Sequence, residues 1–124
     1  MESHEENDSA QNMDEWKARV RDLNDQFRKD RKGGYYSLTK SMVALGYEKC
    51  TEVLQAIAAY DGFTSDNDPP GLHDFGCLTL DGELYFWNID YLDKSQTSDS
   101  PDPADASVTI RFLEIMSSSD FDAA

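Results

Sequence analysis

The residues best suited to acid–base chemistry are His73 and Asp74, at the point where a polar loop gives way to an apolar, strand-like run. A histidine titrates near neutral pH and can transfer protons when a carboxylate orients it. A metal-dependent phosphohydrolase would need further histidine ligands, and the only other histidine of the chain is His4, near the N-terminus. We therefore expect His73 and Asp74 to tie the loop to the strand. A small enzyme with a site around this pair is the alternative.

Metal, thiol and phosphate chemistry have little support in the other residues. Asp66-Asn67-Asp68 begins like a calcium-binding loop, but Pro70 takes the next alternate position and no glutamate closes the loop. Cys50 and Cys77 lack zinc-chelating spacing. No glycine-rich loop leads into a helix to hold a phosphate. We predict no catalytic residue, no metal and no cofactor.

The acidic side chains are concentrated in the second half of the chain. The 124 residues include 25 acidic and 11 basic side chains, which gives a net charge of −14. Residues 61–105 contain eleven acids against Lys94 alone, whereas residues 14–32 contain seven of the eleven basic groups. Such a segment repels nucleic acid and anionic membranes but attracts basic protein surfaces. We expect a basic protein or ribonucleoprotein as partner, without direct binding of nucleic acid or membrane.

The predicted contact surface lies within residues 63–93, where acids and aromatic residues are interleaved. Carboxylates could occupy an Arg/Lys channel in place of phosphates, and aromatic side chains could anchor the contact. The predicted partner-binding residues are Asp66, Asp68, Asp74, Asp81, Glu83, Trp87, Asp90, Tyr91 and Asp93.

The first half of the chain predicts mainly helices. Apolar residues spaced by four, three and four predict an amphipathic helix over about 14–29, which Gly33-Gly34 follows. Residues 35–39 favour a short strand. A turn of helix at 41–44 and a second helix at 48–60 come next.

Asp81-Gly82 is the strongest hairpin signal, because a type I′ turn needs two positive φ angles. It predicts paired strands at 75–80 and 83–91, with Leu78 opposite Tyr85. One face of this hairpin would carry Leu78, Leu80, Tyr85, Trp87 and Ile89, and the other Phe75, Cys77, Leu84 and Phe86. Because both faces are apolar, we expect helices to cover one and a further element or a partner to cover the other.

The end of the chain predicts another helix, since Asp102-Pro103 is typical of a helix start and apolar residues at 108, 112, 115 and 116 follow at helical spacing up to Ser117. The fold class expected is therefore α+β: a small antiparallel sheet of about three strands packed against about three helices. This single domain would span residues 13–118. Residues 1–12 would be a disordered acidic tail and residues 119–124 a second disordered tail.

The run of Asp66-Asn67-Asp68-Pro69, Gly71 and His73-Asp74-Phe75-Gly76 resembles a family of small bacterial proteins of unknown function. Its signature reads D-N-D-P-x-G-x-H-D-F-G. The resemblance covers about residues 17–117 and extends to Leu38-Thr39, Ala44-Leu45-Gly46, Phe86-Trp87, Ile89-Asp90-Tyr91 and residues 100–105. Pro70 and Leu72 depart from the family pattern. The resemblance implies an association with mobile elements and prophages, and hence a role against host defence.

Together these features predict a non-enzymatic acidic binding protein. Its expected role is to inhibit a bacterial defence complex, of the anti-CRISPR or anti-restriction type, by occupying a basic nucleic-acid-binding surface as a DNA mimic. A homodimeric scaffold protein that uses the second apolar face of the hairpin is a further alternative. The sequence has no apolar stretch long enough to span a bilayer and no signal peptide, so we expect a cytoplasmic protein.

Overall fold

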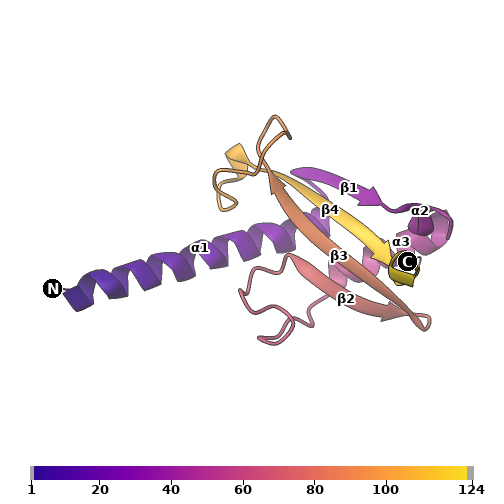
Figure 1. Ribbon diagram of the computed structural model, residues 1–124, viewed down its shortest axis with the longest axis horizontal. Coiled ribbons are helices and arrows are strands. Elements are labelled where there is room, and N and C mark those ends of the chain that lie inside the picture. Colours follow the sequence, from indigo (N-terminus) through magenta and orange to yellow (C-terminus); the bar gives the residue numbers. More distant parts are fainter. Residues whose placement is uncertain (1, 123–124) are drawn as a thin grey trace.

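The computed structural model describes residues 2–122, and the surroundings of the side chains of residues 11–121. A four-stranded mixed sheet in the order β1-β4-β3-β2 forms the centre of the fold (Figure 1). Its strands are β1 (Gly34–Leu38), β2 (Phe75–Leu80), β3 (Glu83–Leu92) and β4 (Ile110–Ser117). The helices are α1 (Glu2–Asp30), α2 (Lys40–Val43), α3 (Tyr47–Ala59) and α4 (Ser119–Asp122), with a 3₁₀ turn at Ala106–Val108. None of the helices described has the length and apolarity needed to cross a membrane.

Helix α1 buries the apolar stripe that its sequence predicts, with Val20 and Phe27 almost wholly buried. It ends at Asp30, and Gly33 then takes a positive φ of 96° that redirects the chain into β1. At its other end the helix begins at Glu2, so the structure is helical where the sequence predicted a disordered tail. Residues 2–12 contain neither glycine nor proline, and acidic side chains near a helix N-terminus are favourable.

The hydrophobic core lies between the sheet and helices α1, α2 and α3. Trp87 has no exposed surface and belongs to one cluster of buried residues with Phe27, Ile57 and Ile115. Gly76 faces Trp87 across the β2–β3 pair, and a Cβ atom there would lie 2.5 Å from the indole ring. Only glycine therefore leaves space for the tryptophan beside this strand.

The hairpin forms as predicted. Asp81 and Gly82 have φ angles of 53° and 82°, which are the two positive values that a type I′ turn requires. Leu80 pairs with Glu83 and Leu78 with Tyr85, in a register that runs without interruption to Phe75 opposite Asn88. The hairpin faces are therefore the two that the sequence predicts.

The predicted C-terminal helix is wrong, because residues 110–117 form strand β4. Exposure alternates along β4, and Arg111, Leu113, Ile115 and Ser117 are buried. The apolar residues that suggested a helix also fit the period of a strand between two neighbours. The β4 strand runs antiparallel to β3 and parallel to β1, so the α+β class is confirmed, with four strands in a mixed sheet.

The ends of this last segment also differ from the prediction. Asp102 does not start a helix; its Oδ1 accepts hydrogen bonds from the Ala104 amide at 3.0 Å and from Trp16 Nε1 at 2.8 Å. Residues 119–122 form the short helix α4, where the sequence predicted a tail. Residues 123–124 of that predicted tail lie outside the described residues.

Candidate functional site

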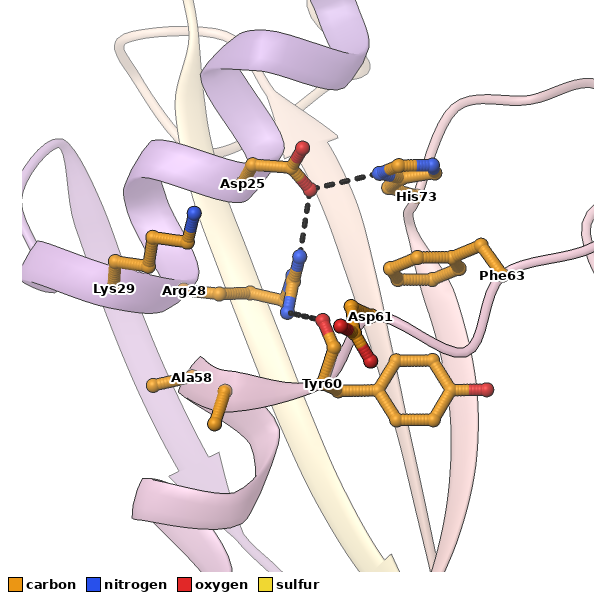
Figure 2. A pocket seen from close by; sticks show the side chains of 9 residues that line it. Asp25, Arg28, Lys29, Ala58, Tyr60, Asp61, Phe63 and His73 are labelled. Atoms are coloured by element: carbon orange, nitrogen blue, oxygen red, sulfur yellow. Dashed lines mark hydrogen bonds and ion pairs between the residues drawn. The ribbon is translucent and has the colours of Figure 1, made fainter.

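His73 joins the loop of residues 61–74 to helix α1 (Figure 2). Its Nδ1 lies 2.8 Å from Oδ1 of Asp25, and its Nε2 lies 3.8 Å from Oδ2 of Asp68. The ring stacks on Phe63 with 3.8 Å between centroids and 7° between planes. His73 has a φ of 55°, a left-handed conformation that costs a non-glycine residue about 1–2 kcal/mol. The stacking on Phe63 and the contacts of the two ring nitrogens with Asp25 and Asp68 therefore hold the His73 ring in a defined place.

Asn67 and Asp68, from the run that begins like a calcium-binding loop, form hydrogen bonds within their own loop. Asp68 is buried and accepts hydrogen bonds from the amides of Leu72 and His73 at 3.3 and 3.1 Å. Asn67 accepts from the Thr64 amide at 2.8 Å. Within the described part of the chain, no group of three or more His, Cys, Asp or Glu side chains could hold a metal ion.

Arg28 lies beside this histidine, and only 2% of its surface is exposed. Its Nη2 donates to Asp25 Oδ1 at 2.6 Å, and its Nη1 donates to the carbonyls of Ile57 and Tyr60 at 2.7 and 3.2 Å. The guanidinium also lies over the Phe63 ring, 5.2 Å from its centroid. Arg28 thereby joins α1 to the carbonyl groups at the end of α3, where a cation is favourable.

A second network connects Asp74 to strand β4. Tyr91 donates its hydroxyl proton to Asp74 Oδ2 at 2.9 Å and accepts from Asn24 Nδ2 at 2.8 Å. Arg111 Nε donates to Asn24 Oδ1 at 2.7 Å, and the guanidinium lies over the Tyr91 ring. Burial raises the pKa of the Asp74 carboxyl, although the Tyr91 hydrogen bond opposes this shift. Burial likewise raises the pKa of the Tyr91 hydroxyl and lowers that of Arg111.

These contacts border a cavity of about 310 Å³ between α1, the end of α3 and the loop (Figure 2). It is lined by Asp25, Arg28, Lys29, Ala58, Ala59, Tyr60, Asp61, Phe63 and His73. Because the Asp25 carboxylate can only accept, Nδ1 of His73 is the donor in this contact, and Nε2 is turned towards Asp68. None of the residues described as lining the cavity is a serine, threonine or cysteine. The described lining therefore supplies an imidazole, the Tyr60 hydroxyl and the Lys29 amine, but no aliphatic hydroxyl and no thiol.

Four of the nine predicted partner-binding residues lie inside the fold. Trp87 is fully buried in the core, and Asp68 is buried in its own loop. Asp74 and Tyr91 are half-buried and hydrogen-bonded to each other. These four side chains position the loop and the sheet.

The other five do not gather on one surface. Asp81 and Glu83 lie at the turn of the hairpin, where Asp81 forms an ion pair with Lys49. Asp93 accepts hydrogen bonds within its own turn, chiefly from the Ser95 hydroxyl, which lowers its pKa. Asp66 and Asp90 are exposed, the first in the loop and the second on the sheet.

Two loops of the acidic segment 61–105, one at Gly71 and one at Ala104, lie against basic side chains of α1. Arg21 donates to the Gly71 carbonyl at 3.2 Å, and Arg19 donates to the Ala104 carbonyl at 3.2 Å. Part of the acidic charge of residues 61–105 is thus placed beside cations of the same chain. The sequence shows the basic residues of 14–32 and the acidic residues of 61–105, but it does not show that these two segments lie side by side.

The sheet face away from the core, which we call the open face, is mostly apolar. By strand alternation and register it consists of Tyr35, Ser37, Phe75, Cys77, Thr79, Leu84, Phe86, Asn88, Asp90, Leu92, Ile110, Phe112, Glu114 and Met116. Tyr35, Phe75 and Leu84 are 52%, 47% and 43% exposed. Helices α1, α2 and α3 contribute to the core on the other face, while α4 reaches the open face through Phe121, whose ring meets that of Phe86.

The open face was predicted only in part. The sequence assigns Phe75, Cys77, Leu84 and Phe86 to one side of the hairpin, and the structure confirms that grouping. It adds Tyr35 from β1 and Phe112 from β4, which strand pairing brings beside them. Asp90 and Glu114 are the charged members of the open face, and both are acidic.

The fold and these two regions define a small α+β protein with a hydrogen-bonded loop on one side of its sheet and, on the other, an apolar surface that is partly exposed within the described residues. A protein-family model described as a protein of unknown function (DUF3768) matches residues 38–120, and the chain belongs to this family. No curated protein and no solved structure matches the chain. The matched region contains His73 and most of the open face, whereas α1, with Asp25 and Arg28, precedes it.

Proposed function

We propose that the protein is a non-enzymatic binding protein that docks its open face on a basic protein surface. The observation that supports this proposal is the exposure of three apolar side chains on that face, Tyr35, Phe75 and Leu84. Monomeric soluble proteins rarely expose large continuous apolar patches, and aromatic residues are enriched where proteins bind one another.

The charge of the open face supports a basic partner. Asp90 and Glu114 are its only charged members, and the chain as a whole has a net charge of −14. A second copy of the chain would bring equal charges together, which opposes association. A partner with Lys or Arg around an apolar patch would match both the apolar side chains of the open face and its two acidic residues.

The more specific role proposed for the protein is inhibition of a bacterial defence complex, of the anti-CRISPR or anti-restriction type. Its basic nucleic-acid-binding surface would have the chemistry that the open face requires. The support for this role is the charge of the chain and the resemblance of its signature residues. Such a complex acts in the bacterial cytoplasm, where we place the protein in this proposal.

Capture from a bacterial host with quantitative mass spectrometry tests the proposal. The wild-type protein is compared with the double variant Asp90→Lys/Glu114→Lys and with Asp66→Lys, which reverses an exposed charge away from the open face. We expect a basic protein to be captured by the wild type and by Asp66→Lys and lost with the double variant. Equal capture by all three would contradict the proposal. Asp68 is unsuitable for charge reversal, because its buried carboxylate holds the loop.

A second candidate function is a small enzyme or small-ligand site at the His73 cavity. The specific observation is a histidine oriented by Asp25 at the edge of a 310 Å³ cavity that also contains the buried Arg28. The variant His73→Gln, checked for folding by circular dichroism, tests it. Full biological activity of a folded His73→Gln variant would exclude this candidate.

A further inference from the structure

The outer edge of strand β2 is open to another strand. Among the strands of residues 2–122, β2 is the last in the sheet order, and the one strand it pairs with there is β3 (Figure 1). In a two-residue hairpin, Leu80 and Glu83 exchange hydrogen bonds, so bonding alternates and the backbone groups of Phe75, Cys77 and Thr79 point outward. The bond from the Ile89 amide to the Asp74 carbonyl, at 2.7 Å, follows the same alternation. Within residues 2–122, no hydrogen bond joins the outward groups to another segment.

This edge has none of the usual protection against strand addition. The sequence of β2 is FGCLTL, without charge or proline, and its six residues pair with β3 without a bulge. Natural edge strands are commonly protected by lysine, proline or a bulge. The opposite edge strand, β1, has five residues and lies between the basic residues Arg31, Lys32 and Lys40.

The charges around the two edges indicate what would pair with β2. Asp74 precedes the strand and Asp81 and Glu83 follow it, and the ion pair of Asp81 with Lys49 leaves these flanks acidic in sum, so an extended segment with lysine or arginine is favoured there and opposed at β1. Antiparallel pairing of two β2 strands would place the Asp74 end of one copy next to the Asp81 end of the other. Charge therefore opposes a second copy at this edge.

We propose that β2 accepts an extended segment of the basic partner as a fifth strand of the sheet. The proposal rests on the proposed function and names the element of the partner that binds. Backbone hydrogen bonds to Phe75, Cys77 and Thr79 would supply affinity, and alternate side chains of the added strand would supply specificity. Those on the open-face side would contact Phe75, which is 47% exposed, and so extend the apolar contact.

Amide hydrogen exchange with a synthetic peptide of alternating lysine and valine tests this proposal. In the free protein, the amides of Phe75, Cys77 and Thr79 should exchange fast, whereas those of Leu78 and Leu80 are protected by β3. Addition of the peptide should slow exchange at the first three amides. Failure of the peptide to bind, or protection at β1 instead of β2, would overturn the proposal.

Proline substitution removes one outward donor without a change in the β2–β3 pairing. Proline is tolerated in an edge strand where its nitrogen faces away from the sheet. We expect Thr79→Pro to weaken peptide binding about tenfold, and Thr79→Val to leave it unchanged. If Thr79→Pro does not fold, Thr79→Lys should weaken binding through edge charge. Unchanged affinity in the folded variant would contradict the proposal.

The outcomes separate this proposal from the proposed function. Peptide-induced changes confined to open-face side chains, without protection of the β2 amides, would overturn strand addition and leave docking by the open face in place. Loss of partner capture with Asp90→Lys/Glu114→Lys but not with Thr79→Pro would likewise overturn strand addition and leave docking by the open face in place. If protection of the β2 amides rises with protein concentration in the absence of peptide, a second copy of the chain is the occupant of this edge. That result would overturn the proposal that a basic segment binds there.

Discussion

The two faces of the sheet receive four aromatic strand residues each, but these differ in chemistry and surroundings. The face covered by helices receives Tyr36, Tyr85, Trp87 and Tyr91, and the open face receives Tyr35, Phe75, Phe86 and Phe112. The covered aromatic residues all have a polar atom, and Tyr36 and Tyr91 donate hydrogen bonds to Phe27 and Asp74. Three of the four on the open face are phenylalanines, which gain nothing from contact with water. The comparison separates a face that is covered by helices and hydrogen-bonded to them from a face that keeps aromatic side chains such as Tyr35 and Phe75 exposed.

Replacement of one aromatic residue on each face should give the largest difference. Trp87→Ala should lower the free energy of unfolding by about 3–5 kcal/mol, because a fully buried side chain leaves a cavity. Phe75→Ala should change it by less than about 0.5 kcal/mol, as expected of an exposed site. Urea denaturation of both variants measures this. Similar losses from the two variants would show that the open face also contributes to the core.

Removal of the buried cation should give the next largest effect. Arg28→Met should lower the free energy of unfolding by about 2–3 kcal/mol, because two carbonyls of the α3 end lose their donor and Asp25 loses its ion pair. Chemical denaturation measures the loss, and Lys29→Met is the matched control in the same turn of α1. A loss no larger than that of Lys29→Met would show that the guanidinium does not fix α1 to α3.

The pH dependence of the covered face should give a smaller effect. The pKa of Asp74 in the folded protein is raised above its ordinary value of 3.8, which applies to the unfolded chain. At a pH between 3.8 and the raised pKa, the folded state therefore binds more protons than the unfolded state. The contribution of Asp74 to stability should therefore fall as the pH rises through this window. Asp74→Asn should be the more stable protein at neutral pH and should lose that advantage as the pH is lowered towards 4.

Thermal unfolding of wild type and Asp74→Asn across this pH range measures the effect. The asparagine oxygen can still accept the Tyr91 hydroxyl proton, so the comparison isolates the charge. A pH-independent difference between the two proteins would contradict the assignment.

Charge reversal on the open face should have the smallest effect on stability. Asp90→Lys should change the free energy of unfolding by less than about 0.5 kcal/mol, because this side chain is exposed. Its effect should be on partner capture instead. A large loss of stability, measured by urea denaturation, would remove the distinction between the two faces.

Local signals explain which parts of the fold the sequence predicts. Asp81-Gly82 determines its own turn, and the pairing of Leu78 with Tyr85 follows from it. Residues 110–117 lack such a signal, because their apolar spacing fits both a helix and a strand. Their pairing depends on β1 and β3, which are distant in the sequence.

The candidate site was harder to predict for the same reason. Asp25 and Arg28 are two charged residues among many on α1, and His73 lies 48 residues beyond Asp25. Both hairpin faces are apolar, so the sequence does not show that helices cover the one with Trp87. That residue was predicted as a partner contact and is instead fully buried.

The order of strands in the sheet also constrains how the protein is made. β4 lies between β1 and β3, yet it is the last strand that a ribosome synthesises. Until β4 is complete, β1 has no strand to pair with. In the hairpin, β2 and β3 can pair with each other, but the other edge of β3 is unpaired. Folding of the sheet therefore has to wait until β4 has been synthesised, and the nascent chain exposes the aromatic residues of both faces until then.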